Sequence, residues 1–213
     1  KASQDRLRKD PGDLNALDPF NKHALVNGYL IRPEKIPAST VKCIREFVAL
    51  HGHREWRGFG SMNYRLMRDG SGFLAAEQWP DLRDVDGLDA AQIRAATAGR
   101  LYGYFDTIVR KNLDEYNAPT YYTTDLMAVR MLAEFAKDPQ MRQRATLTLD
   151  WMMISLACSW NQGYHIATAG RSKGWSCVTT SPDGSDTTAA VGWIWFGGRR
   201  GIEPSHTCPH HTF

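Results

Sequence analysis

The spacing of apolar residues along this chain predicts a succession of amphipathic helices. Leu126, Val129 and Leu132 recur every three positions, which places their side chains on one face of a helix. Pro119 disfavours helical backbone at the residue before it, so this helix should begin beyond the proline. The residues from Glu115 to the start of the helix are polar and aromatic, and they predict a loop at its N-terminal end.

Similar periodic stretches predict further helices on both sides of this one. Asp89 is a good N-cap, and Asp138 followed by Pro139 gives a cap with proline at the first helical position. Ser39 or Thr40 can cap an earlier helix. The expected helices cover residues 21–29, 39–50, 62–78, 89–113 and 139–160. Their connections are short, and consecutive helices with short connections pack as antiparallel pairs.

The pattern changes after Asn161, where glycine and serine become frequent. The apolar run AAVGWIWFGG at 189–198 predicts a strand, with Trp193 and Trp195 on one face, either packed in the core or serving as a sugar platform. We therefore expect a mainly α fold with a small β portion near the C-terminus. The predicted division of the chain is a lead-in at 1–38, a helical domain at 39–172 and a loop and strand segment at 173–213.

Composition narrows the class of protein. The 213 residues carry a net charge of +3, which is too close to neutral to predict a nucleic-acid partner. No apolar run reaches the roughly 20 residues of a membrane helix, so no membrane partner is expected. The chain begins at Lys1 without a signal peptide, which suggests processing or truncation. Its four cysteines permit two disulfides but require none: Cys43, Cys158, Cys177 and Cys208.

The loop before the helix at 126–135 is the first candidate site. It holds Glu115, Asn117 and Tyr121 at a helix N-terminus, where unpaired N–H groups and partial positive charge suit an anionic ligand. Loops mounted on a scaffold often carry function. The alternative is a helix cap with surface tyrosines.

Two stretches resemble a known family. SMNYRLMRDGSGFLAAEQWPD at 61–81 and EYNAPTYYTTDLMAVRMLAEFAKDPQMRQRATLTLDWM at 115–152 resemble α/α-toroid polysaccharide-degrading enzymes of the heparinase type, over residues 55–172. The resemblance implies an incomplete toroid of antiparallel helix pairs with a carbohydrate groove, and relatives include polysaccharide lyases and glycoside hydrolases. A complete toroid is longer than this chain, so a fragment is expected, or a homo-oligomer that completes the groove.

The first functional hypothesis is lyase chemistry, β-elimination at a uronic acid of an acidic polysaccharide. This reaction needs a group that neutralises the carboxylate, a base and an acid. Amides suit the first role, tyrosine and histidine suit the others, and Arg171 could bind a sugar carboxylate. The predicted catalytic residues are Asn117, Tyr121 and His165. The predicted substrate-binding residues are Asn63, Tyr64, Glu115, Tyr122 and Arg171.

Two other hypotheses stay open beside the lyase. A glycoside hydrolase would use two carboxyl groups, and the candidates are Glu55, Asp69, Glu77, Glu115 and Asp125. A non-catalytic glycan-binding or scaffold role is the third. All three predict a polysaccharide or oligosaccharide partner, no cofactor and a secreted or periplasmic location. They require that the turn before Thr123 and the segment near His165 open onto a common cleft.

Other histidines give weaker signals. The tail HTCPHH contains His206, His210, His211 and Cys208, which are good ligands for a transition metal. Their spacing matches no zinc finger, so no metal site is predicted. His51 and His53 flank a glycine at a helix end and are expected to be loop residues.

Overall fold

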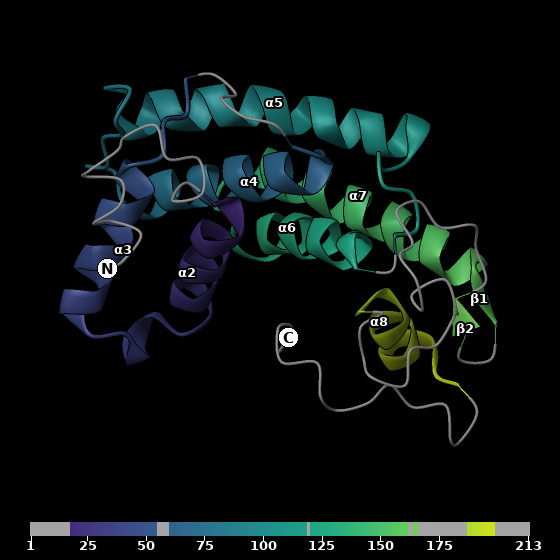
Figure 1. Ribbon diagram of the computed structural model, residues 1–213. Coiled ribbons are helices and arrows are strands. Elements are labelled where there is room, and N and C mark those ends of the chain that lie inside the picture. The colour runs from purple at the N-terminus through teal and green to yellow at the C-terminus, as the bar shows by residue number, and fades with distance from the viewer. Residues whose placement is uncertain (1–17, 55–59, 119, 162–163, 166–186, 199–213) are drawn as a thin grey trace.

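The fold is mainly helical, as expected (Figure 1). The structure is a computed structural model that describes residues 18–54, 60–118, 120–161, 164–165 and 187–198. The helices are α2 (Pro19–Ile31), η1 (Pro33–Lys35), α3 (Ala38–Ala49), α4 (Met62–Gln78), α5 (Ala90–Lys111), α6 (Tyr121–Phe135), α7 (Pro139–Cys158) and α8 (Thr187–Phe196). β1 (Trp160–Asn161) and β2 (Tyr164–His165) form a short antiparallel pair.

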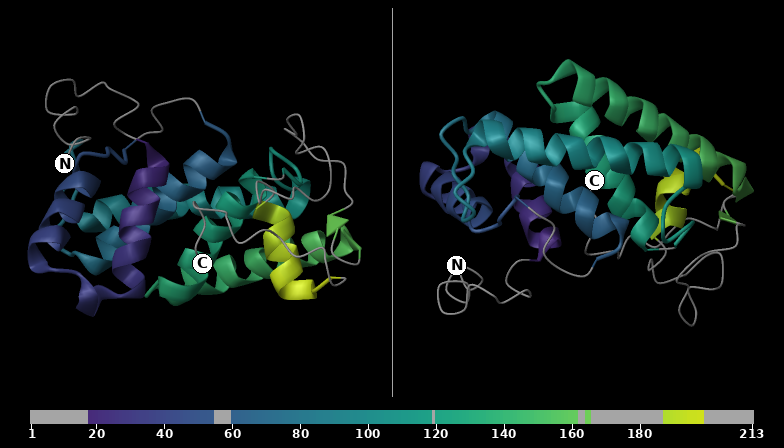
Figure 2. Two further views of the ribbon diagram at one scale, coloured as in Figure 1. Left: turned by 60° about the horizontal axis from the view of Figure 1, so that its bottom comes forward. Right: turned by 90° about the horizontal axis from the view of Figure 1, so that it is seen from above.

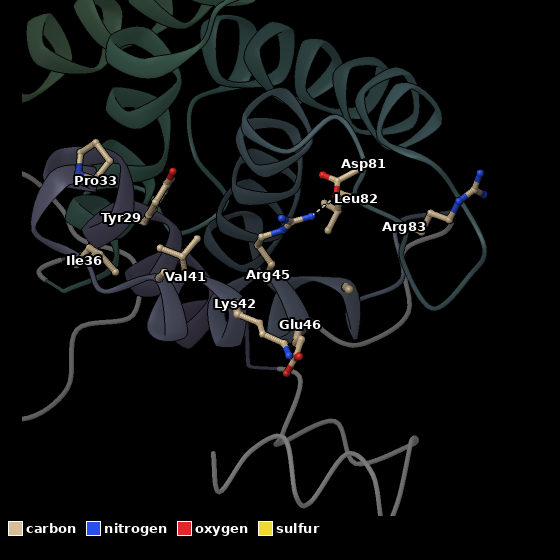
Figure 3. A pocket seen from close by; sticks show the side chains of 12 residues that line it. Tyr29, Pro33, Ile36, Val41, Lys42, Arg45, Glu46, Asp81, Leu82 and Arg83 are labelled. Carbon is tan, nitrogen blue, oxygen red and sulfur yellow. Dashed lines mark hydrogen bonds and ion pairs between the residues drawn. The ribbon is translucent and has the colours of Figure 1, made fainter.

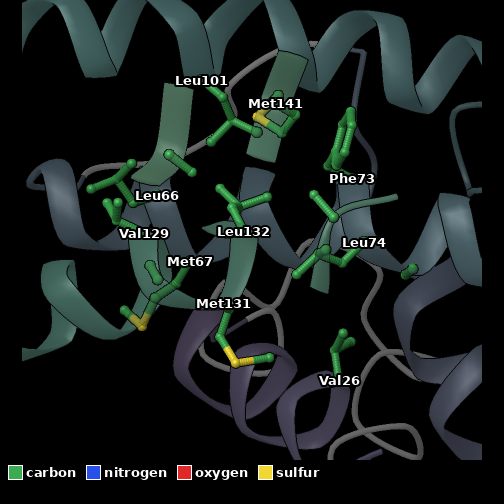
Figure 4. Packing of buried hydrophobic residues seen from close by; sticks show 14 of the residues in the cluster. Val26, Leu66, Met67, Phe73, Leu74, Leu101, Val129, Met131, Leu132 and Met141 are labelled. Atoms are coloured by element: carbon green, nitrogen blue, oxygen red, sulfur yellow. The ribbon is translucent and has the colours of Figure 1, made fainter. Parts of the chain in front are cut away.

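Helix α4 is the centre of the molecule. All its residues except Tyr64, Arg65 and Gln78 are buried, because α2, α5 and α6 pack around it. Figure 4 shows Leu66 and Phe73 of α4 among apolar side chains of the neighbouring helices, including Leu132 of α6. A helix buried on all sides positions both of its ends firmly, and the candidate residue Asn63 lies at one of them.

Consecutive long helices pack as antiparallel pairs, as the short connections predicted. Asn63 at the start of α4 contacts Glu115, just beyond the end of α5, and Asp69 in mid-helix contacts Arg100. In the second pair, Tyr122 at the start of α6 contacts Met152 near the end of α7. Figure 2 shows α2 and α3 at one end of the helical body and α8 at the other. Closure of these pairs into part of a toroid remains a prediction.

The sequence signals located most helix ends correctly. α4 covers the expected residues, Asp89 forms a capping box with Gln92 at the start of α5, and the Asp138 side chain accepts a hydrogen bond from the backbone N–H of Met141 at the start of α7. α3 begins at Ala38 after Pro37, so neither Ser39 nor Thr40 is its cap. The helix expected at 21–29 is α2, which packs against α4.

The strand predicted at 189–198 is wrong, because residues 189–196 lie in α8. A short apolar run rich in aromatic residues does not by its periodicity distinguish a strand from a buried helix. Trp193 and Trp195 therefore do not share a face: Trp193 is half-buried, whereas Trp195 is 69% exposed. Close packing fits the helix, since a Cβ at Gly192 would overlap the Trp160 ring. The β structure found near the C-terminus is the β1–β2 pair.

Candidate functional site

Four polar side chains, Asn63, Glu115, Asn117 and Asp125, form what we call the amide–carboxyl cluster. Asn63 comes from the first turn of α4 and Asp125 from α6, while Glu115 and Asn117 lie in the connection between α5 and α6. The amide Nδ2 of Asn63 donates to Oε2 of Glu115 at 2.8 Å, and its Oδ1 accepts from the Ser61 hydroxyl at 2.8 Å. Asn63 is buried beneath a half-buried Glu115, so the carboxylate is held at the edge of the protein by an oriented amide.

Asn117 takes a backbone conformation that favours few residue types. Its φ is +49°, in the left-handed region that asparagine tolerates better than most residues. The turn is closed by the backbone N–H of Ala118, which donates to the carbonyl of Glu115 at 3.0 Å. The side chain is fully buried, and among the described residues neither its Nδ2 nor its Oδ1 has a hydrogen-bond partner. Each such atom costs about 1–3 kcal/mol, so the chain maintains an unused donor and acceptor here at a cost.

Asp125 is the second buried group with unused capacity. Burial raises its pKa well above the ordinary value, and the negative charges of Glu115 and Asp114 raise it further. Its Oδ1 has no partner in the described part of the chain. This upward shift favours the protonated form of the carboxyl group, which can donate a hydrogen bond.

Helix α8 brings the histidine segment to the same end of the molecule. The Thr188 hydroxyl donates to the Ala118 carbonyl at 2.9 Å, and the Thr187 hydroxyl contacts the Thr120 carbonyl at 3.2 Å. β2, which contains His165, also packs against α8. Burial lowers the pKa of His165, and its Nε2 has no partner among the described residues. The turn before Thr123 and His165 thus lie against one helix, while a cleft shared by them remains a prediction.

Tyr122, which the sequence predicted to bind substrate, lies in the core. Helix α6 begins at Tyr121, so Tyr122 points into the interface with α7, where its hydroxyl donates to the Met152 carbonyl at 2.6 Å. It is 1% exposed, which leaves the ring to the core. Tyr121 is half-buried in the first helical turn, and Tyr64 is half-buried and packs edge-on against Phe20. Arg171 lies outside the described residues.

The structure sorts the five candidate carboxyl groups for hydrolysis. Glu77 accepts hydrogen bonds from the backbone N–H groups of Lys137 and Asp138 at 2.7 and 2.9 Å, so it stabilises the start of α7. Asp69 is bound by Arg68 and Arg100. Glu55 lies outside the described residues. Glu115 and Asp125 remain as the carboxyl groups of one site.

A second set of buried polar side chains lies in the core, and the sequence did not predict it. The Lys22 ammonium group lies 2.6 Å from Nε2 of His53, whose Nδ1 lies 3.0 Å from Asp84. Beside them Asp69 pairs with Arg68 and Arg100. These six residues are the central ion cluster below. His51 and His53 lie in the loop after α3, as expected, but both are buried. A lysine among the inward positions of α2 was the available signal for this cluster.

Burial controls the charge of the central ion cluster. It lowers the pKa of Lys22 well below the ordinary value, and the positive charge of Arg68 adds to that effect. Burial also lowers the pKa of His53, with Lys22 as the next cause. Because the Asp84 carboxylate accepts, His53 carries its proton on Nδ1 and accepts from Lys22 through Nε2. The arrangement is a packed chain of donors and acceptors in the core.

The described residues contain no group of three or more side chains suited to a metal ion. Cys43 and Cys158 are both exposed. Cys177, Cys208 and the histidines of the tail lie outside the described residues. None of the helices in the described part combines the length and apolar character needed to cross a membrane.

Comparison with known proteins does not assign this chain to a family. No family model, no curated protein and no solved structure matches it. The likeness to toroid enzymes therefore rests on the two motifs alone, and a functional argument has to come from the geometry of the amide–carboxyl cluster.

Proposed function

We propose that this protein is a carbohydrate-active enzyme that cleaves an acidic polysaccharide by lyase-type β-elimination, with the amide–carboxyl cluster at its catalytic centre. One observation carries the proposal: Asn117 and Asp125 are buried with polar atoms that no described residue pairs. The more accessible Glu115 is two positions from Asn117 in the chain, and its charge acts on Asp125. Buried polar groups that serve structure are normally paired. Unpaired groups are retained where a ligand completes them, and polar groups aimed at a ligand are typical of binding sites.

The groups of the cluster suit a substrate carboxylate. The protonated Asp125 and the Asn117 amide can both donate hydrogen bonds to it without leaving a positive charge behind. A neutral acid used as a donor is an established device for stabilising charge that develops next to a carbonyl or carboxylate. Arg171, predicted to bind the same group, would add a bidentate contact.

The remaining steps are assigned to His165 and Tyr121. The lowered pKa of His165 keeps its imidazole neutral, so it can accept the proton next to the sugar carboxylate. The electron pair from that C–H bond forms the new double bond, the glycosidic C–O bond breaks, and Tyr121 gives its proton to the leaving oxygen. Glu115, held by Asn63, would orient the sugar hydroxyl groups at the edge of the site.

Hydrolysis is a second candidate, favoured by the effect of Glu115 on Asp125. Two neighbouring carboxyl groups whose environments differ can divide the roles of acid and base. In that case Asp125 would protonate the leaving oxygen and Glu115 would activate water or attack the sugar. A neutral polysaccharide would then be a substrate as well.

One assay separates these reactions. The protein is incubated with alginate, glycosaminoglycans, ulvan and neutral glycans, while the absorbance of unsaturated uronates and the number of reducing ends are followed independently. A lyase raises both signals, and a hydrolase raises reducing ends only. Release of neither product from any polymer would count against a catalytic role.

Three variants locate the activity. Asn117→Gly keeps the positive φ but removes the amide, and Asp125→Asn removes the acid; each should lower the rate at least about 100-fold. Glu134→Gln is the matched control, because Glu134 lies on the same helix but pairs with Arg130 at the surface. Full activity of Asn117→Gly would place the chemistry elsewhere.

A further inference from the structure

A pocket with a cavity volume of about 720 Å³ lies at the other end of the molecule from the amide–carboxyl cluster. It is bordered by α2, η1, α3 and the segment 81–83, and Figure 3 shows its lining side chains. Ligand pockets typically measure about 300–1,000 Å³. Trp79, beside the pocket, caps the C-terminal end of α4, whereas Asn63 is in its first turn. A helix of 17 residues separates them by roughly 25 Å.

Aromatic and apolar groups form one part of the wall, and their positions are fixed. The Tyr29 ring packs against Trp79 with 5.2 Å between the ring centroids, and its hydroxyl accepts a hydrogen bond from Gln78 at 3.1 Å. Ile36 and Val41 add aliphatic surface. Such a wall favours a ligand with a flat or ring-shaped apolar face.

The polar part of the wall carries charges of both signs. Lys42 and Glu46 come from α3, and Arg45 of the same helix pairs with Asp81 across the pocket. The Arg45 guanidinium also lies 5.9 Å from the centroid of the Trp79 ring. With Arg83, three basic groups and two carboxylates line the pocket. An anionic ligand would therefore meet carboxylates and a cationic ligand would meet basic groups, so neither sign of charge is strongly favoured.

A neutral ligand rich in hydroxyl groups fits both parts of this wall. Each hydroxyl can donate to Glu46 or Asp81 and accept from Lys42 or Arg45, while the C–H face of a sugar ring can cover an aromatic side chain. The Arg45–Asp81 pair is exposed, and an exposed pair is easily rearranged around a ligand. We propose that this pocket is a binding site for a neutral saccharide unit of an oligosaccharide chain. The proposal uses only the chemistry of the wall and does not depend on the catalytic chemistry proposed above.

The test is a titration of the full chain with neutral oligosaccharides, by calorimetry and by saturation-transfer NMR. Cello-, manno-, xylo- and chito-oligosaccharides are the probes, and octanoate and octylamine are the charged non-sugar comparisons. At least one sugar series should bind with a Kd of about 0.1–10 mM. The double variant Arg45→Gln/Asp81→Asn, which removes both charges but keeps polar side chains at the two positions, should weaken that binding at least tenfold.

One control keeps this result specific. Arg130→Gln/Glu134→Gln removes another exposed pair, whose residues do not line the pocket, and this variant should bind the sugar like the unchanged protein. The proposal is overturned if no sugar binds at 10 mM, if only octanoate or octylamine binds, or if the Arg45→Gln/Asp81→Asn variant binds as well as the unchanged protein. Sugar binding here without cleavage of any polymer would contradict the proposed enzyme while supporting this site.

Discussion

The central ion cluster and the amide–carboxyl cluster each include buried polar side chains of α4, yet they differ in how completely their hydrogen bonds are made. In the first, Asp69 accepts from Arg68, Arg100 and Tyr104. In the second, Asn117 and Asp125 keep polar atoms that no described residue pairs. Because its polar atoms are hydrogen-bonded, the central ion cluster is a structural network. The amide–carboxyl cluster has polar atoms without such partners among the described residues, so it is the better candidate for contact with a ligand.

Asp84 shows how thoroughly the central ion cluster is satisfied. Its carboxylate accepts from the backbone N–H and from Nδ1 of His53, at 2.9 and 3.0 Å, and from the backbone N–H groups of Asp86 and Leu88 at 3.0 and 2.9 Å. Four donors on one carboxylate fix the segment that follows α4 and hold His53 in one orientation. The cluster therefore defines where α2 and α5 sit on α4.

The largest expected effect comes from breaking the satisfied cluster. Asp69→Ala leaves the buried guanidinium of Arg68 and the partly buried Arg100 without their carboxylate, and removing one member of a buried pair costs about 3–5 kcal/mol. Urea unfolding of the two proteins measures this loss. Asp81→Ala is the matched control, since it also removes an arginine partner, but at a position that is 72% exposed. Equal effects of the two substitutions would mean that burial does not distinguish the pairs.

The second prediction concerns the amide–carboxyl cluster, where a substitution should raise the stability instead of lowering it. Asp125→Asn should raise the free energy of unfolding at pH 7 by on the order of 1 kcal/mol, because asparagine has the shape of the protonated acid and cannot ionise. A functional group that costs stability is expected to behave in this way.

The pH dependence checks this effect independently. The folded-state pKa of Asp125 is raised, so the stability contributed by the protonated acid is fully present below the unfolded value of about 3.9 and is lost as the pH rises through the folded-state pKa. The difference between Asp125→Asn and the unchanged protein should therefore grow from pH 4 to pH 8. A difference that stays constant over this range would show that Asp125 does not change its ionisation on folding.

The last prediction compares two glycines of α4 that adjoin different neighbours. A Cβ at Gly70 would lie 3.5 Å from Leu132, an ordinary contact, whereas a Cβ at Gly72 would lie 2.5 Å from Nε2 of the fixed His53. Gly70→Ala should stabilise by about 0.5–1 kcal/mol through helix propensity, and Gly72→Ala should destabilise by about 1–3 kcal/mol through overlap. Thermal unfolding of both variants compares them directly. Stabilisation by Gly72→Ala would mean that His53 is not held as described.

Local signals in the sequence were enough for much of the fold. Period and caps defined α4, α5 and α7, because Asp89, Asp138 and Pro139 act on backbone groups within three residues of themselves. The antiparallel pairing followed from short connections. The same reasoning found Asn63, Glu115 and Asn117 as candidates, since polar residues cluster in the connection that leads to α6.

Contacts between residues far apart in the sequence could not be predicted from such local signals. Lys22 and His53 are 31 positions apart, and no local pattern shows that α2 turns that lysine toward a histidine. The sequence does not distinguish Tyr122 from its neighbour Tyr121. The position of each residue in the first turn of α6 decides that the Tyr122 ring is buried in the core. The apolar run at 189–198 fits the sequence pattern of a strand. Its packing as a helix against α6 and Trp160 depends on contacts that this local pattern does not contain.

The two adjacent threonines at the start of α8 have a consequence for shortening the chain. Their hydroxyls donate hydrogen bonds to the carbonyl oxygens of Ala118 and Thr120, next to the first turn of α6. A protein ending before Thr187 would expose those oxygens and the flank of α6 to water. Trimming the C-terminus would therefore loosen the support beneath Asn117, although α8 lies about 70 positions away from it in sequence.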